Sequence, residues 1–197
     1  KILILGANGM LGHVLFNSFI KNNQFITIGT LRKKEYKNYF KKEFRNNLLI
    51  SKDFCNFDNL NKMIKLVKPD YLINCIGIIK QKDSFNYAKM ILINSLLPRK
   101  LSQICEKSKT KLILISTDCV FLGEKGNYKE KDITDAIDTY GISKLLGECI
   151  NERNLIIRTS IIGPELNSKN GLLEWFLSQN EQVNGFKNFY FSGVTTF

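Results

Sequence analysis

The chain has 197 residues, of which 44% are hydrophobic and 24% charged, so its composition is that of a globular protein long enough to bury a core. It contains no run of about 18 apolar residues and no secretory signal, and we expect neither a membrane span nor export, but a cytoplasmic location. A single histidine, His13, and five scattered cysteines without a C-x-x-C pair predict no metal site, no disulfide framework and no Ser-His-Asp triad.

The formal net charge of +11 raises the question of a nucleic-acid partner, and residues 32–45 interleave basic with aromatic side chains. Lysine, asparagine and isoleucine are nevertheless abundant along the whole chain, and no recognised nucleic-acid motif accompanies the charge. Positive potential also attracts phosphorylated small molecules. We therefore do not expect nucleic acid to be the partner.

Short apolar, β-branched runs alternate with longer segments of helical period, which is the pattern of βαβ units. The expected strands are residues 1–5, 25–31, 47–51, 70–76, 111–116 and 154–159. The expected helices are residues 10–22, 57–67, 85–107 and 139–152. Helices of this length suit the right-handed crossovers of a parallel sheet. The predicted fold class is a doubly wound, Rossmann-like α/β sheet.

A glycine-rich turn follows the first expected strand and opens the first helix. Gly6 would permit the tight turn, Gly9 the close approach of backbone to a pyrophosphate, and Gly12 close packing of helix on strand. An ordinary strand-to-helix turn is the alternative interpretation, but the position at the start of a βαβ pattern favours a dinucleotide. The residues expected to contact this cofactor are Gly6, Asn8, Gly9, Met10, Leu11 and Gly12.

The segment after the second strand bears on the choice between NAD and NADP. No acidic residue stands there to bind a ribose 2′-hydroxyl; Arg32, Lys33 and Lys34 follow instead. A guanidinium can bind a 2′-phosphate through two hydrogen bonds. A solvated loop is the plainer interpretation of the lysines, so we predict that NADP(H) is preferred and that NAD(H) is possible.

Two further strand ends are expected to contact the cofactor, because ligands of such sheets bind at the carboxyl ends of the strands. Asp53 follows the third strand and is expected to face the adenine. Cys75, Ile76 and Gly77 follow the fourth strand.

The expected catalytic residues are Thr117, Tyr140 and Lys144. Tyr140 and Lys144 lie one turn apart on one helix face, and Thr117 ends the preceding strand. A Tyr-Lys pair is weak evidence alone, but its place after the fifth strand lets the three side chains meet one carbonyl. The ammonium and an oxidised nicotinamide would lower the pKa of the phenol, which could then act as the acid, while Thr117 holds the carbonyl oxygen. Lys144 could also bind the nicotinamide ribose.

The chain shows no internal boundary within residues 1–160, which we expect to form the NAD(P)-binding domain with the catalytic residues. Residues 161–197 change in pattern and are expected to begin a substrate-binding region that is truncated. Within it, residues 172–177 predict a short helix and residues 186–191 a short strand.

The residues of these motifs and their order along the chain resemble the dTDP-4-dehydrorhamnose reductase family of the extended short-chain dehydrogenase/reductase superfamily. The segments that carry the resemblance are Gly6–Leu15, Pro69–Cys75, Ile115–Phe121, Gly126–Glu130, Tyr140–Glu148 and Ile157–Ser160. The resemblance implies hydride transfer from NAD(P)H to the C4 ketone of a nucleotide-linked 6-deoxy-4-hexulose, for deoxysugar and surface polysaccharide synthesis. It places Thr117, Tyr140 and Lys144 in the catalytic positions. It also makes Trp175, Lys80 and Gln81 candidates for substrate contact.

Other functions of the same superfamily stay open at this point. Dehydratases place Asp-Glu after the catalytic threonine, whereas Cys119 follows Asp118 here, which disfavours dehydration. A sugar-nucleotide epimerase and a non-catalytic dinucleotide-binding subunit, such as the regulatory subunit of methionine adenosyltransferase, are the alternatives. A homodimer is compatible with the sequence, which names neither the sugar nor the nucleotide.

Overall fold

A computed structural model describes residues 1–79, 86–166 and 171–196. Its main sheet has six parallel strands in the order β3-β2-β1-β4-β5-β6, which is that of a doubly wound α/β sheet. The strands are β1 Ile2–Leu5, β2 Thr27–Leu31, β3 Leu48–Ile50, β4 Tyr71–Asn74, β5 Lys111–Ile115 and β6 Asn154–Ile157. The predicted fold class is confirmed, and each expected strand is present with ends that differ from the expectation by at most two residues.

Helices fill the connections between these strands. The α-helices are α1 Met10–Ile20, α2 Phe57–Val67, α3 Tyr87–Ile91, α4 Leu97–Ser108, α5 Thr139–Gly147 and α6 Leu172–Leu177. The other helical turns are the 3₁₀ segments η1 Lys34–Tyr39, η2 Lys42–Asn47 and η4 Asp118–Val120, and the π-helical turn η3 Leu92–Leu96. The single helix expected over residues 85–107 thus consists of α3, η3 and α4 in succession.

The helix expected over residues 139–152 was predicted too long, because α5 ends at Gly147. Glu148 leaves the helix with φ −69° and ψ 117°, an extended conformation. Its carboxylate is bonded to Ser116 and Arg158. These contacts with other elements draw the chain out of the helical path.

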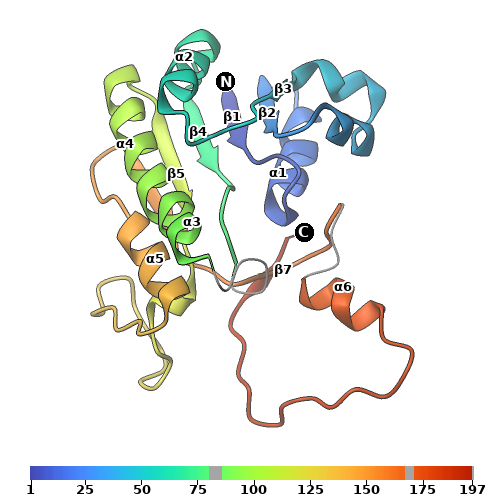
Figure 1. The fold of residues 1–197 in the computed structure, drawn as a ribbon, viewed down its shortest axis with the longest axis vertical. Helices are drawn as coiled ribbons and strands as arrows, with labels where there is room; N and C mark the ends of the chain where they lie inside the picture. The colour runs from blue at the N-terminus through green and yellow to red at the C-terminus, as the bar shows by residue number, and fades with distance from the viewer. Residues whose placement is uncertain (80–85, 167–170, 197) are drawn as a thin grey trace.

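The sheet is covered on both faces, with α1 on one face and α2, α4 and α5 on the other (Figure 1). Alternate residues of β1 face the two layers, as the pleat of a strand requires. Leu3 and Leu5 belong to the apolar cluster that includes α2 and α4. Ile4 belongs to the cluster on the other face, where Phe16 of α1 meets Phe40 edge-on at 5.3 Å between ring centroids. A central strand apolar on both faces follows from this arrangement.

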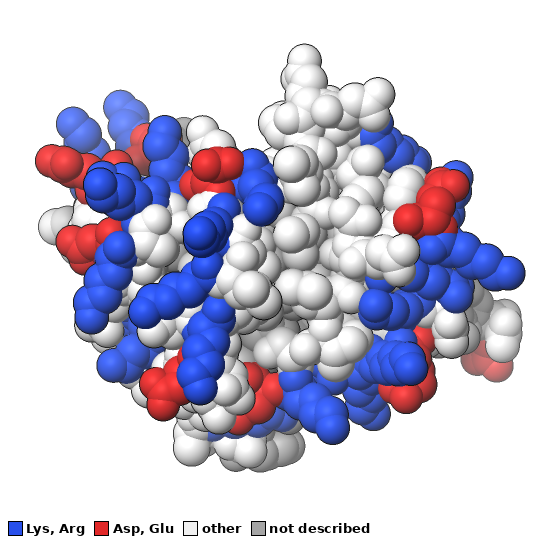
Figure 2. Space-filling view, turned by 90° about the horizontal axis from the view of Figure 1, so that it is seen from above, with Lys and Arg blue, Asp and Glu red and all other residues white. Residues whose placement is uncertain are grey.

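Phe40 also explains the basic and aromatic segment that follows β2. This segment forms η1 and η2, and Phe40 is buried while Tyr36 and Phe44 pack against the same cluster. Arg45 donates from Nε to the carbonyl oxygen of Phe40 at 3.0 Å. The aromatic side chains therefore serve packing as part of the domain. Seen from the end of the molecule where the chain begins, basic and acidic side chains lie together at both sides of a mostly uncharged band (Figure 2).

The segment after β6 crosses to the carboxyl ends of the strands, where α6 lies beyond α1 (Figure 1). There β7 Ile161–Ile162 and β8 Val194–Thr195 form a parallel pair. The strand predicted over residues 186–191 is wrong: that segment is irregular, and Phe186 and Tyr190 are 89% and 94% exposed. Aromatic, β-favouring residues do not make a strand without a neighbouring strand to pair with. The division at residue 160 stays a prediction.

None of the helices in the described ranges combines the length and apolarity that crossing a membrane requires.

Candidate active site

The glycine turn lies at the carboxyl end of β1, where the sheet order reverses between β1 and β4. Gly6 has a φ of 74°, which favours glycine, and a Cβ on Gly12 would come within 2.2 Å of the carbonyl oxygen of Gly6. Both glycines therefore have the steric roles expected of them. The turn is held to β2, since Gly6 donates its N–H to Oγ1 of Thr30 at 3.1 Å.

The N-terminus of α1 is open to an anion. Gly9 is its N-cap, no side chain caps it, and the first turn holds no acidic residue. The unpaired N–H groups and the helix dipole of such an end attract phosphate. The expected contacts Asn8, Met10 and Leu11 lie in the same turn. The start of α6 is adjacent, because a Cβ on Gly171 would come within 3.0 Å of Cε of Met10. These residues fit a dinucleotide pyrophosphate.

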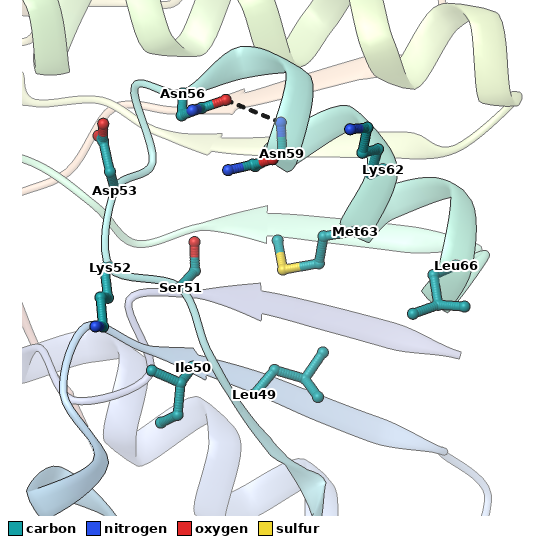
Figure 3. A pocket seen from close by; sticks show the side chains of 10 residues that line it. All are labelled: Leu49, Ile50, Ser51, Lys52, Asp53, Asn56, Asn59, Lys62, Met63 and Leu66. Atoms are coloured by element: carbon teal, nitrogen blue, oxygen red, sulfur yellow. Dashed lines mark hydrogen bonds between the residues drawn. The ribbon is translucent and has the colours of Figure 1, made fainter.

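Arg32 is exposed directly after β2, and Asp53 is exposed after β3. Asp53 lies at one end of a groove of about 640 Å³ that runs between β3 and α2, with Lys52 beside it and Met63 and Leu66 further along (Figure 3). Oδ1 of Asp53 accepts the N–H of Cys55 at 2.8 Å, which fixes the turn. These two residues lie at the opposite end of the carboxyl edge from the catalytic candidates.

The end of β4 connects the glycine turn with the catalytic candidates. A Cβ on Gly6 would lie 3.0 Å from Cγ1 of Ile76 and 3.4 Å from the backbone of Cys75. A Cβ on Gly77 would lie 3.9 Å from Nζ of Lys144. Burial raises the pKa of the Cys75 thiol to about 12, against the opposing charge of Lys144, so the thiol is neutral. The structure therefore brings Gly6, residues 75–77 and Lys144 together.

Thr117 and Tyr140 come from different elements and meet because α5 packs tightly on η4. Thr117 is buried at 4% exposure, and its Oγ1 accepts the N–H of Cys119 at 3.2 Å. A Cβ on Gly141 would come within 2.3 Å of the carbonyl oxygen of Cys119, so a larger residue would force α5 away. Asp138 caps α5 by accepting the N–H of Tyr140 at 3.0 Å. This packing sets the Tyr140 phenol beside the threonine.

The pKa of Tyr140 differs from the sequence-based expectation. Burial raises it, a hydrogen bond with Thr117 acts against the rise, and the charges of Cys119, Asp118 and Asp138 add to it. The protein groups around Tyr140 therefore keep the phenol protonated, and Lys144 is not among the groups that shift its pKa. The expected effect of an oxidised nicotinamide on this pKa stays a prediction. A protonated phenol is the state that a proton donor needs.

Lys144 is largely buried, and its Nζ donates to the carbonyl oxygen of Ile115 at 2.5 Å. Burial lowers the pKa of Lys144 to about 8, while the charge of Glu148 acts against the decrease. A buried lysine that titrates near neutral pH, beside a buried threonine and tyrosine, marks a candidate active site.

Sequence reasoning missed Asn94, which lies in the π-helical turn and is 2% exposed. Its Nδ2 donates to the carbonyl oxygen of Ile78 and to Oγ of Ser143, both at 3.0 Å, and its Oδ1 accepts the N–H of Ile78 at 2.9 Å. Asn94 thereby ties the segment after β4 to α5. The signal available in the sequence was an asparagine inside an otherwise apolar helical run. The π-helical turn is a further indication, since such turns often occur at functional sites.

Other site expectations have simpler outcomes. Lys80 and Gln81 lie outside the described residues, and Trp175 lies on α6 with 45% exposure. Among the described residues, no group of three His, Cys, Asp or Glu side chains could hold a metal ion.

Strand order, glycine turn and the Thr117, Tyr140 and Lys144 cluster together define a Rossmann-type protein of the short-chain dehydrogenase/reductase class. Residues 1–185 match the family described as the RmlD substrate binding domain, and the chain belongs to this family. The predicted resemblance is thereby confirmed.

Relatives with known names agree with this placement. A structure described as a hypothetical dTDP-4-dehydrorhamnose reductase from Sulfolobus tokodaii is 32% identical with a TM-score of 0.70, over 82% of this chain and 56% of that one. The dTDP-4-dehydrorhamnose reductase of Aggregatibacter actinomycetemcomitans is 26% identical over 81% of this chain and 51% of the relative. Methionine adenosyltransferase 2 subunit beta of Danio rerio is 26% identical over 75% of this chain and 42% of the relative. The chain spans about half the length of the curated relatives it matches.

Proposed function

We propose that this chain carries the cofactor and catalytic residues of an NADP(H)-dependent reductase that acts on the C4 ketone of a nucleotide-linked 6-deoxy-4-hexulose, in deoxysugar and surface polysaccharide synthesis. The observation that carries the proposal is the meeting of Thr117, Tyr140 and Lys144 at the carboxyl edge of the sheet, next to Gly77 and the glycine turn. The named reductases among the relatives support the substrate class.

Each residue has a role in this reaction. A reduced nicotinamide, when bound, supplies hydride to the carbonyl carbon. The phenol of Tyr140 donates its proton to the carbonyl oxygen, which completes the alcohol. The hydroxyl of Thr117 donates a hydrogen bond to the same oxygen and holds it within reach of Tyr140. The ammonium of Lys144 is placed beside Gly77 to bind the nicotinamide ribose.

The pyrophosphate of the cofactor would lie against the N–H groups at the start of α1, contacted by residues 6–12. Asp53 would face the adenine, and Cys75, Ile76 and Gly77 would line the nicotinamide half. Arg32 would bind the 2′-phosphate of NADP(H), with NAD(H) as the weaker alternative. A cytoplasmic location and a homodimer remain predictions, and sedimentation of the purified protein tests the second.

Replacement of Tyr140 by phenylalanine tests the catalytic assignment. Tyr140→Phe removes the proton donor and little else, so we expect turnover to fall by at least about a hundredfold with cofactor affinity nearly unchanged. Oxidation of NADPH with a dTDP-linked 4-hexulose measures turnover, and Tyr87→Phe, at a 57% exposed position on α3, is the matched control. Lys144→Ala should impair both turnover and cofactor binding. Near-normal turnover in Tyr140→Phe would refute the mechanism.

Arg32→Ala tests the cofactor preference. Fluorescence titration should show tighter binding of NADPH than of NADH, and a loss of this preference in Arg32→Ala. Arg153→Ala, at an exposed arginine before β6, is the control that should leave the ratio unchanged. Equal affinities in the unmodified chain would contradict the assignment.

A non-catalytic binding subunit is the second candidate, because the Danio rerio relative is named as a subunit of methionine adenosyltransferase. This alternative predicts dinucleotide binding without turnover, and Tyr140→Phe would then change nothing. An epimerase of the same superfamily would interconvert sugar nucleotides without net consumption of NADPH. Oxidation of NADPH therefore separates the reductase from both alternatives, and conversion of the sugar nucleotide without NADPH consumption separates the epimerase from the binding subunit.

A further inference from the structure

A buried carboxylate that the proposed mechanism does not use lies next to the catalytic candidates. The side chain of Glu148 is 5% exposed. Its Oε1 accepts from Oγ of Ser116 at 2.6 Å and from Nε of Arg158 at 2.9 Å, and its Oε2 accepts from Nη2 of Arg158 at 2.7 Å. The residues that directly follow β5, α5 and β6 thus converge on one charge, and both oxygens of the carboxylate are satisfied.

This carboxylate and the ammonium of Lys144 are held by consecutive residues. Ile115, the last residue of β5, accepts from Nζ of Lys144, and the next residue, Ser116, donates to Glu148. Lys144 and Glu148 are four residues apart in the chain and line the same cavity of about 10 Å³. A space of this size holds about one water at most.

We propose that Glu148 is a positioning residue, which keeps the buried Lys144 charged and in place beneath the active site. This inference rests on the proposed function, in which the ammonium of Lys144 binds the nicotinamide ribose. Burial acts against the charged form of Lys144, and a fixed carboxylate nearby acts for it.

Arg158 and Ser116 make Glu148 suitable for this role. A buried carboxylate without partners tends to take up a proton and lose its charge, whereas a guanidinium bonded through two nitrogens keeps it ionised. Arg158 is itself anchored: Nη1 donates to the carbonyl oxygen of Glu130 at 3.3 Å, and the guanidinium lies 5.3 Å from the ring centroid of Phe121. The ion pair therefore has a defined geometry.

Other titratable groups lie around α5, and none of them takes the place of Glu148. Cys75, at the end of β4, is neutral because burial raises its pKa to about 12. Arg99 of α4 donates to the carbonyl oxygen of Leu146 at 2.6 Å and carries the wrong sign. Asp118 and Cys119 of η4 raise the pKa of Tyr140 on α5, and they do not act on the pKa of Lys144. Among the described residues, Glu148 is the carboxylate that acts on Lys144.

The test is the titration of Lys144 in Glu148→Gln, measured without cofactor or substrate. Competitive labelling with acetic anhydride across a pH series, read by mass spectrometry, reports the midpoint for this lysine. We expect a midpoint near pH 8 in the unmodified protein and a decrease of about one pH unit, a tenfold change in the protonation equilibrium, in Glu148→Gln. Glu152→Gln, at an exposed position four residues further along the chain, should leave the midpoint unchanged.

The alkaline limb of the turnover profile should move with the labelling midpoint, in kcat more than in KM, and Glu148→Asp should restore part of the shift. An unchanged Lys144 midpoint in folded Glu148→Gln would overturn the proposal. If the midpoint shifts but no reduction occurs in any variant, the electrostatic role of Glu148 stands and the proposed function fails.

A second variant decides the question if Glu148→Gln does not fold. Glu148→Asp keeps a carboxylate near Arg158 but shortens the side chain by one methylene, so the labelling midpoint of Lys144 should decrease by less than about one pH unit. A Lys144 midpoint that is unchanged in folded Glu148→Asp would also overturn the proposal.

Discussion

The burial of Lys144 predicts how stability depends on pH, and Lys144→Met tests it. Below about pH 8 both the folded and the unfolded chain carry this proton, and the folded chain bears the cost of a buried ammonium. Between pH 8 and 10.5 the folded chain has released the proton and the unfolded chain still binds it. The contribution of Lys144 to the free energy of unfolding therefore rises with pH through this window.

The magnitude follows from the two pKa values. The ordinary value of 10.5 and the value of about 8 in the folded chain differ by an amount worth about 3 kcal/mol, at about 1.4 kcal/mol per pH unit. Because the ammonium keeps a hydrogen bond and part of the side chain reaches solvent, we expect about 1–2 kcal/mol between pH 7 and pH 10. Methionine has a similar length and no charge, so its variant lacks this term.

Urea unfolding of the unmodified protein and of Lys144→Met at pH 7 and pH 10 measures the effect. The relevant quantity is the difference in free energy of unfolding between the two proteins at pH 10, minus the same difference at pH 7. Titration of cysteines and tyrosines on which Lys144 does not act affects both proteins equally and cancels. Relative to Lys144→Met, the unmodified protein should gain stability at pH 10. A difference that is the same at both pH values, or of opposite sign, would refute the burial argument.

Two further predictions concern packing. Gly141→Ala should lower the free energy of unfolding by about 1–3 kcal/mol, because the new Cβ would meet the carbonyl oxygen of Cys119 at 2.3 Å. Urea unfolding checks this, with Gly185→Ala, which has open space around it, as a control that should be nearly neutral. Phe16→Ala should cost about 3–5 kcal/mol because the ring is fully buried, whereas Phe186→Ala, at an 89% exposed position, should cost little. Equal thermal stability of these two variants would contradict the assignment of the core.

Much of the fold could be predicted from local pattern. The helix over residues 57–67 was predicted with the bounds it has, because Asn56 caps its start by accepting the N–H of Asn59 and its apolar residues recur at helical spacing. The strand over residues 186–191 could not be judged in this way. Its aromatic residues favour β-structure locally, but pairing depends on a second strand that the sequence pattern does not locate.

The site shows the same division. The sequence by itself determined which residue types follow each strand: glycines after β1, cations after β2, Thr117 after β5, and Tyr140 with Lys144 on the next helix. Parallel strands end at one edge, so local pattern was enough to predict that these residues gather there. Only the tertiary structure decided that Glu148 of α5 would be buried against Arg158, and that burial would set the pKa values of Tyr140 and Lys144. Loss of solvent and the distances between charges depend on how separate elements pack, and no local pattern contains them.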